Sequence, residues 1–261
     1  MKAHRVMAVV MRHVYLFPRS FDRITDAFFW PILDILLWGM AGKWLTESQP
    51  QDASVITALL CSLLLWRVVW HTTYEVGINL LEECWNRNLT NLFSSPLTKL
   101  EWLAANLIVG LVKVVIIVAV GAAAAWLLYH ANLFAPGWMW LPYFASLLVS
   151  GWALGCFTSA LVLRWGIRVQ ALIWTIAFIL APISAVYFPV RLLPEALQYP
   201  AYLLPTTYIF EGLRALLIEH RQDYRLLEAS ALLNIAYFAL SLWFINLMFE
   251  KTREHGFDDL E

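Results

Sequence analysis

Charged residues are scarce in this sequence, and that scarcity excludes most kinds of soluble protein. Asp, Glu, Lys and Arg make up only 14% of the 261 residues, whereas 61% are hydrophobic. A balance of this kind is typical of a polytopic membrane protein. The formal net charge of −1 also gives no basis for nucleic-acid binding, which needs a concentrated basic surface.

Cysteine and recognisable catalytic motifs are also rare or missing. Cys61, Cys84 and Cys156 are isolated from one another, so they indicate neither a disulfide framework nor a metal cluster. The sequence contains no phosphate loop of the Walker A type, no HExxH and no GxSxG. We therefore expect no catalytic residue, cofactor site or metal site in this chain, and any ATP hydrolysis that drives its function would take place in another polypeptide.

Long apolar segments occupy most of the chain. A helix needs about 20 mostly apolar residues to cross a bilayer, and six segments reach or approach that length: 25–44, 54–73, 102–129, 139–163, 169–187 and 226–249. The fourth contains Gly151 and Gly155, whose spacing favours close packing against another helix of the same chain. The sequence therefore predicts an all-α, polytopic integral membrane protein with six transmembrane helices, forming one domain over residues 1–261.

The distribution of basic residues predicts the orientation. One basic group precedes the first span and another follows the fourth: Lys2, Arg5, Arg12, Arg19, Arg23, Arg164 and Arg168. Because basic loops tend to stay in the cytosol, we expect both termini there. Four arginines after the fifth span argue the other way: Arg191, Arg214, Arg221 and Arg225.

Residues 1–23 predict an amphipathic helix that lies on the membrane surface. Arg5, Arg12 and Arg19 repeat every seven residues and share one face. An apolar stripe occupies another face, which favours an interfacial helix over a solvated basic tail. Pro18 ends the helix.

The stretch between the second and third spans, residues 83–97, is short and amphipathic. Its apolar residues recur at helical spacing and its other positions are mostly polar; the apolar set is Trp85, Leu89, Leu92 or Phe93, and Leu97. Pro96 breaks this helix, and Thr98 and Glu101 have the spacing of a capping box that starts the next one. The sequence predicts a surface helix that meets a cytosolic partner.

Residues 188–220 are apolar but too often interrupted by proline to form one spanning helix. The prolines are Pro189, Pro194, Pro200 and Pro205. Irregular backbone at membrane depth must find its hydrogen-bond partners in protein or water. We therefore expect short re-entrant or interfacial helices here, beside the exit of a transport path.

A ribbon of polar residues runs along the second span. Arg67, His71, Glu75 and Asn79 follow one another at four-residue intervals, and charged groups in a bilayer need partners or water. Asp34 is expected at the same membrane depth as Arg67 and is its predicted partner; Lys113 in the third span is the predicted partner of Glu75. Such pairs either fix helix register or contact cargo, and the sequence leaves both interpretations open.

Aromatic residues are frequent in spans one, two and five. They include Phe29, Trp30, Trp66, Trp70, Tyr74, Trp174 and Phe178. A surface of this kind suits an amphipathic, lipid-linked or drug-like molecule better than a free ion. Core packing explains many of these side chains equally well.

Taken in order along the chain, these features resemble the membrane subunits of type-2 ATP-binding-cassette (ABC) exporters. The resemblance covers the basic surface helix, Phe29-Trp30-Pro31, the sequence NLFSSPL at 91–97, Leu193-Pro194 and the sequence PTTYIFEGLR at 205–214. It implies a permease in a bacterial inner (plasma) membrane that homodimerises or pairs with a similar subunit. A separate ABC ATPase would bind the ATP and Mg²⁺.

The resemblance also implies roles for two sets of residues. Residues 83–97 would be the coupling helix that docks on the ATPase, with Glu83, Trp85, Arg87, Leu89, Leu92, Phe93 and Pro96 as candidate coupling residues. Residues 188–220 would supply the outer re-entrant helices, with Pro189, Pro194, Pro205, Tyr208, Glu211 and Arg214.

Two other classes of function make different demands on the sequence. A stand-alone ion-coupled transporter or channel would use Asp34, Arg67, His71 and Glu75 as a proton relay. An integral-membrane enzyme would need a polar catalytic cluster, which the sequence does not contain.

Overall fold

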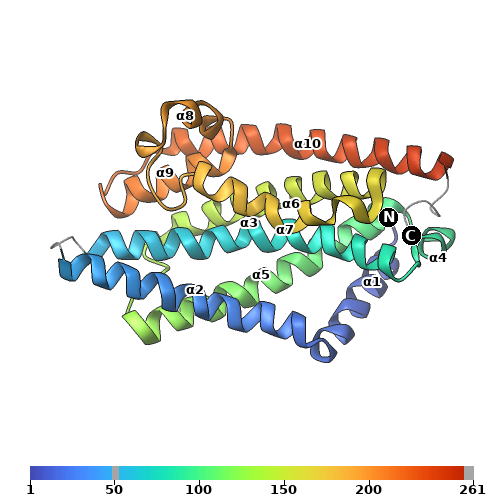
Figure 1. Cartoon of the computed structure of the whole chain (residues 1–261), viewed down its shortest axis with the longest axis horizontal. Helices are drawn as coiled ribbons and strands as arrows, with labels where there is room; N and C mark the ends of the chain where they lie inside the picture. The colour runs from blue at the N-terminus through green and yellow to red at the C-terminus, as the bar shows by residue number, and fades with distance from the viewer. Residues whose placement is uncertain (49–52, 256–261) are drawn as a thin grey trace.

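The computed structural model describes residues 1–48 and 53–255, and within them it consists of helices and contains no strand. Five long helices lie side by side along the long axis (Figure 1): α2 (Phe21–Ser48), α3 (Ala53–Trp85), α5 (Lys99–Tyr129), α6 (Trp140–Trp165) and α10 (Tyr224–His255). The shorter helices are α1 (Ala3–Leu16), α4 (Leu89–Ser94), α7 (Gln170–Ile183), α8 (Glu195–Tyr202) and α9 (Pro205–Leu217). Single 3-10 turns occupy Phe17–Arg19, Gly137–Met139, Gly166–Val169 and Val190–Leu192. The predicted all-α class is confirmed.

Five helical segments of the described chain are long and apolar enough to cross a membrane. They are Arg23–Trp44, Val55–Trp85, Lys99–Tyr129, Gly137–Ile183 and Tyr224–Glu254. The fourth contains both α6 and α7, joined by the 3-10 turn Gly166–Val169. Figure 1 shows α7 running back along the bundle from the end that α6 reaches. The chain is therefore a multi-pass membrane protein.

Helix α7 is shorter than the span predicted at 169–187. It has 14 residues and ends at Ile183, which gives a length of about 21 Å at 1.5 Å per residue. A turn follows in which Ala185 has a φ of 58°. Because the hydrocarbon core of a bilayer is about 30 Å thick, α7 reaches only part of the way across.

The two ends of the bundle differ. One end, called here the α4 end, holds α1, α4 and the last turn of α10 (Figure 1). The other, the α8 end, holds α8 and the starts of α3 and α10. Both described ends of the chain, Met1 and His255, therefore lie at the α4 end, as predicted for a chain whose termini share one side. Residues 256–261, the end of the predicted domain, lie outside the described residues.

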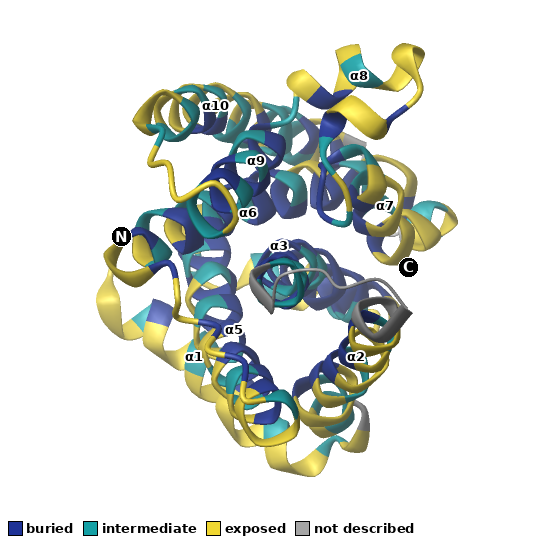
Figure 2. Ribbon diagram, turned by 90° about the vertical axis from the view of Figure 1, so that its left-hand side faces the viewer, coloured by how far each residue is buried: buried dark blue, intermediate teal, exposed yellow. Residues whose placement is uncertain are grey.

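Helix α3 lies at the centre of the bundle. In the end view of Figure 2 it is surrounded by α2, α5, α6 and α7, while the outer faces of α2 and α10 are exposed. In the most apolar part of α3, 72% of the residues are buried, against 22% in α2 and in α10. Helices α2 and α10 therefore present apolar faces to lipid or to another protein.

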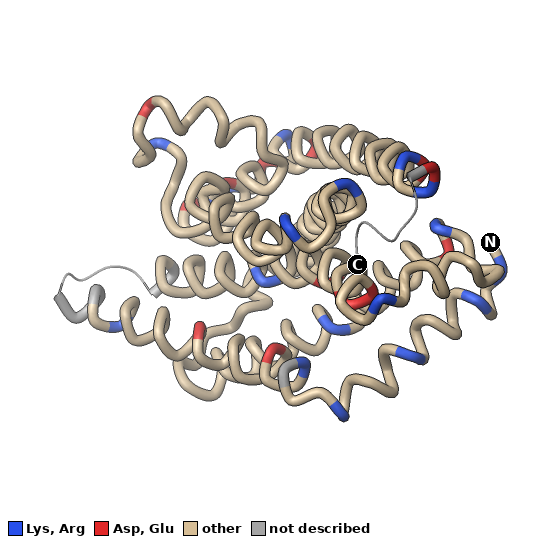
Figure 3. Tube along the Cα trace, turned by 45° about the vertical axis from the view of Figure 1, so that its right-hand side comes forward, with Lys and Arg blue, Asp and Glu red and all other residues tan. Residues whose placement is uncertain are grey.

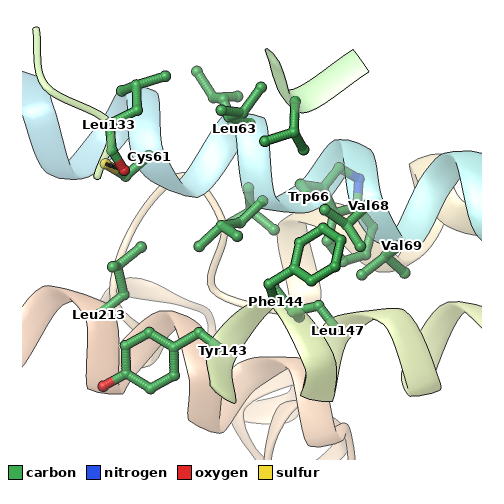
Figure 4. Close-up of a cluster of buried hydrophobic side chains, with 14 of the residues drawn as sticks. Cys61, Leu63, Trp66, Val68, Val69, Leu133, Tyr143, Phe144, Leu147 and Leu213 are labelled. Carbon is green, nitrogen blue, oxygen red and sulfur yellow. Dashed lines mark hydrogen bonds between the residues drawn. The ribbon is translucent and has the colours of Figure 1, made fainter. Parts of the chain in front are cut away.

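Small residues bring α6 against α3. A Cβ atom at Gly151 would lie 2.9 Å from the carbonyl oxygen of Val69, and it would also clash with the side chain of Thr72. A Cβ at Gly155 would lie 3.2 Å from two carbonyl oxygens of α3. Beside this contact, Trp66 and Val69 of α3 pack with Phe144 and Leu147 of α6 (Figure 4). The prediction that the two glycines mediate packing within the chain is confirmed.

The segment 83–97 is not the single helix that was predicted. Helix α3 continues to Trp85, the chain turns at Arg87 with a φ of 51°, and α4 has only six residues. The sequence Asn-Arg-Asn at 86–88 accounts for the break, since Asn favours caps and turns over helix interiors. The capping box was predicted correctly: the Thr98 side chain accepts from the backbone of Glu101, and the Glu101 side chain accepts from the backbone of Thr98.

The N-terminal and the proline-rich segments are helical where their patterns predicted short helices. Helix α1 ends at Leu16, and a 3-10 turn with Pro18 separates it from α2. Residues 188–220 form one 3-10 turn followed by α8 and α9. Pro205 occupies the first turn of α9, where its missing N–H has no helical partner to lose.

We predict that Gly151→Ala lowers the stability of the folded protein. The added methyl group has no room between α6 and α3, and overpacking of this kind costs about 1–3 kcal/mol. Thermal unfolding in detergent measures the effect, with Ala145→Val on the exposed side of the same helix as the control. Equal melting temperatures for the two variants would contradict the close approach.

Candidate functional site

A cavity of about 720 Å³ lies between α2, α3 and α7, with one side chain from α5. We call it the charged cavity. Its lining includes Arg23, Asp26, Asp34, Arg67, Asn79, Glu82 and Lys113, together with six aromatic side chains: Trp30, Trp70, Tyr74, Trp85, Trp174 and Phe178. Of the polar ribbon predicted on the second span, Arg67 and Asn79 line this cavity, and His71 and Glu75 contact its lining residues Asp26 and Lys113.

The predicted pair of Asp34 and Arg67 is present on the wall of the charged cavity. The guanidinium Nε of Arg67 donates to Oδ2 of Asp34 at 2.5 Å, and a terminal nitrogen of Arg67 bonds to the same oxygen. The guanidinium carbon also lies 5.5 Å from the ring centre of Trp70, at a distance where cation–π attraction operates. Two elements far apart in sequence, α2 and α3, are tied together at this point.

The second predicted pair, Glu75 with Lys113, is also present. Nζ of Lys113 lies 2.5 Å from Oε2 of Glu75, whose side chain is almost fully buried. The amide nitrogen of Asn79 donates to Glu75 at 3.1 Å and to Asn106 at 2.6 Å. This network links α3 to α5 and gives the buried carboxylate the partners that a charge in a low-dielectric setting needs.

Two further polar contacts that were not predicted from the sequence border the cavity. Nδ1 of His71 lies 3.3 Å from Oδ2 of Asp26, and Arg23 bonds to Glu82 at 2.6 Å. The depth of these residues along α2 and α3 could have predicted the contact between Asp26 and His71. Helices α2 and α3 form an antiparallel hairpin, so residues at similar distances from their connection face each other. With Asp34 paired to Arg67, Asp26 is the remaining acidic residue of α2 within about one helical turn of the depth of His71.

The aromatic residues form a continuous wall on one side of the charged cavity. Trp70 stacks on Tyr74 with ring centres 5.2 Å apart, and Tyr74 lies 5.0 Å from Trp174 of α7. Phe178 meets Trp70 edge-on at 5.9 Å. Trp174 and Phe178 remain 40% and 61% exposed, so this wall continues onto the outer surface of the bundle.

Two of the predicted aromatic residues do not line the charged cavity. Trp66 is buried and packs against Phe210 of α9 at 6.0 Å. Phe29 lies on the exposed face of α2 beside Trp30. The core-packing explanation therefore holds for Trp66.

At the α4 end, α1 binds both ends of the segment that contains α4. Arg12 lies 2.6 Å from Glu83 at the end of α3, and Arg5 lies 3.6 Å from Glu101 at the start of α5. The backbone nitrogen of Lys2 also donates to Glu101 at 2.6 Å. These contacts hold α1 and the segment 83–101 together.

His13 anchors α1 from its buried face. Burial, as the largest cause, lowers the pKa of His13 to about 4, so the imidazole is neutral at pH 7. Because this pKa is below the unfolded value of about 6.5, the unfolded state binds more protons between these values, and the docking of α1 weakens as pH falls through that range.

The candidate coupling residues differ in exposure. Trp85, Arg87 and Pro96 are exposed, Leu92 and Phe93 are half-buried, and Glu83 and Leu89 are buried. Phe93 packs against Phe249 of α10 with ring centres 4.8 Å apart. The apolar positions of α4 therefore face the bundle, and its polar positions are the accessible ones.

The candidate residues at the α8 end join α9 to the turns before it. Oε1 of Glu211 accepts from the backbone nitrogen of Val190 at 2.8 Å and from Arg214 at 3.1 Å. Arg214 also bonds to the carbonyl oxygen of Ala185. The hydroxyl of Tyr208 donates to the backbone carbonyl oxygen of Tyr202 at 2.8 Å. Pro189 and Pro194 precede the two short helical segments that these bonds hold.

The sequence of this bundle matches a known family. Residues 43–247, more than half of the chain, match the family model described as ABC-2 family transporter protein. The chain belongs to the ABC-2 family. It is a membrane permease subunit, and membership of this family implies association with an ABC ATPase. No curated protein matches the chain.

For this ABC-2 permease we predict energetic coupling between Asp34 and Arg67. Asp34→Asn or Arg67→Met alone leaves one charged partner without its counter-charge and should cost about 1.5–3 kcal/mol, while the double variant should recover part of that loss. Thermal unfolding of the wild type, the two single variants and the double variant completes the double-mutant cycle. The exposed pair Glu219 and Arg221, 3.7 Å apart, is the control and should show no coupling. Strictly additive losses at Asp34 and Arg67 would contradict the pair's role.

Proposed function

We propose that this ABC-2 permease is the membrane subunit of an ATP-driven exporter for an amphipathic, lipid-linked or drug-like molecule. The observation that carries the proposal is the charged cavity, where a wall of aromatic rings faces a row of paired charges. The rings would contact the apolar part of the cargo, and the polar side chains would contact its head group. A small ion has no apolar surface for the aromatic wall to contact.

The position of the charged cavity supports lateral access from the membrane. Trp30 on α2 and Phe178 on α7 border it and are 46% and 61% exposed. An amphiphile in the bilayer would therefore meet aromatic surface before it reaches the charges. Because each charged side chain already has a partner, a polar group of the cargo would have to replace that partner. We propose that the pairs fix the relative positions of the helices until cargo enters.

We propose six transmembrane segments, the fifth made of the short helix α7 together with the turns on either side of it, with the α4 end in the cytosol. Basic residues support this orientation: Figure 3 shows Lys and Arg along α1 and at the end of α10 near the N-terminus. Arg164 and Arg168 flank the turn between α6 and α7, and Leu163 beside them accepts a hydrogen bond from Thr252 near the end of α10. Positive charge favours the cytosolic side.

The segment around α4 is the proposed docking site of a separate ATPase that binds ATP and Mg²⁺. Its exposed residues include Trp85, Arg87, Asn91 and Pro96. Movement of this segment would reach α1 through Arg12 and Glu83, and α10 through the contact of Phe93 with Phe249. ATP turnover would thus act on several helices at once.

A second permease, identical or similar, is proposed to cover the exposed faces of α2 and α7. Phe28, Phe29 and Trp30 are at least 42% exposed on three successive positions of α2. Large exposed apolar patches mark membrane or protein contacts. Because Trp30 lines the charged cavity, a partner there would close its open side.

We predict that Arg87→Glu weakens ATPase binding by about tenfold, equivalent to 1.4 kcal/mol, without unfolding the permease. Arg87 is exposed in the turn before α4, so its reversal leaves the core untouched. Co-purification and the affinity for the cognate ATPase are the measurements, and Arg191→Glu, an exposed arginine at the α8 end, is the matched control. If Arg87→Glu binds the ATPase normally and Arg191→Glu loses binding, the ATPase docks at the α8 end, and the proposed membrane orientation is reversed.

The cargo assignment is tested by reconstitution with the cognate ATPase. Lipids, lipid-linked glycans and hydrophobic drugs should stimulate ATP turnover, and Trp174→Ala should raise the half-maximal concentration by about tenfold, because ring contacts of this kind contribute about 0.5–2 kcal/mol each. Trp126→Ala, exposed on α5 away from the cavity, should behave like the wild type. Stimulation by small ions alone would favour the ion-coupled transporter instead.

A further inference from the structure

A second cavity lies on the other side of α7. It has a volume of about 560 Å³ and is enclosed by α3, α6, α7, α10 and the start of α9. We call it the apolar pocket. Ile176 and Leu180 of α7 line it, whereas Trp174 and Phe178 of the same helix line the charged cavity. Alternate faces of one short helix thus border two cavities of different chemistry.

The apolar pocket offers almost nothing to a polar ligand. None of the described residues that line it is charged. Its main polar groups are engaged within the protein. Ser150 donates to Asn234 at 2.7 Å, and Asn234 donates to the backbone carbonyl oxygen of Ser146 at 2.9 Å. The hydroxyl of Tyr237 donates to the backbone carbonyl oxygen of Leu203 at 2.9 Å. A bound molecule would therefore be recognised by its shape and apolar surface.

Three residues that line the pocket are exposed: Leu240 and Trp243 of α10, at 56% and 60%, and Phe157 of α6, at 38%. Leu240 and Trp243 lie near the middle of the segment Tyr224–Glu254, and we place the mouth of the pocket at these side chains. Since Tyr224–Glu254 is apolar enough to cross the bilayer, the middle of this segment faces hydrocarbon and not water. The molecules that reach such an opening are the acyl chains of the membrane.

We propose that the apolar pocket binds one acyl chain of a bilayer phospholipid. An empty pocket would leave its walls without van der Waals partners, and water is a poor occupant of a space lined by satisfied or apolar groups. Its volume is within the range of about 300–1,000 Å³ that is usual for small-molecule sites. Because no charge lines the pocket, the site selects the chain and not the head group. The site is separate from the proposed cargo cavity.

Photochemical labelling tests the site directly. The permease in nanodiscs is irradiated with a phosphatidylcholine whose acyl chain carries a diazirine, and the adducts are mapped by mass spectrometry. Adducts at Phe157, Leu240 and Trp243 should saturate as the fraction of probe rises. Adducts at Leu232 and Ile235, which are 70% and 68% exposed on α10, should rise in proportion, because they report bulk lipid.

A pocket-filling variant makes the test specific. Ala153→Phe places a ring inside the pocket, since Ala153 is on its wall, and should reduce the saturable adducts by about tenfold while leaving those at Leu232 and Ile235 unchanged. If this variant does not fold, as judged by thermal unfolding, Leu240→Trp at the exposed mouth takes its place. A phosphatidylglycerol probe should label equally well.

Three results would overturn the proposal: no adducts in the pocket, pocket adducts that never saturate, or labelling that depends on the head group. Displacement of the probe by a transported amphiphile, with no displacement by unlabelled phospholipid, would also overturn it and would make the pocket part of the cargo path. None of these results bears on ATPase binding at α4, and the first three leave the assignment of cargo to the charged cavity untouched, so failure of this proposal is distinguishable from failure of the proposed function.

Discussion

The constraint on which this structure depends is that the central helix, α3, carries ionisable groups into an apolar bundle. Arg67, His71 and Glu75 each need a partner, because a charged or polar group left unpaired at membrane depth is costly. Their partners come from α2 and α5: Asp34, Asp26 and Lys113. The pairs therefore fix how α2 and α5 are placed and rotated around α3. The same pairs border the charged cavity, so the groups that order the bundle also give the cavity its polar wall.

Helix α7 is the element around which the two cavities are arranged. It has 14 residues and only three of them are fully buried, so it contributes side chains to spaces on both sides. Its aromatic face meets paired charges, and its aliphatic face meets a pocket without charge. On the proposals made above, cargo would occupy one side and an acyl chain the other. Movement of α7 would then change both spaces together, which connects lipid packing to the cargo path.

The α4 end shows how a short surface helix is held in place by the elements around it. A helix of six residues has little stability of its own, and α4 is instead fixed by its surroundings. Leu89 is fully buried, Phe93 packs on Phe249, and Arg12 and Arg5 of α1 reach Glu83 and Glu101 on either side of the segment. Its polar face is left accessible. An ATPase that binds this face would therefore act on α1, α3, α5 and α10 rather than on a loose loop.

The sequence alone determined the all-α class, the apolar segments, the capping box at Thr98, and the pairs of Asp34 with Arg67 and Glu75 with Lys113. These follow from rules that act over one helical turn, or from depth along a span counted at a fixed rise per residue. Tertiary structure decided that Asp26 is the partner of His71, that Trp66 borders the apolar pocket while Trp70 lines the charged cavity, and that 83–97 contains a turn and a short helix. It also decided that α7 separates two cavities. Which neighbour a side chain faces depends on the rotation and crossing of whole helices, and those are set by packing across the bundle.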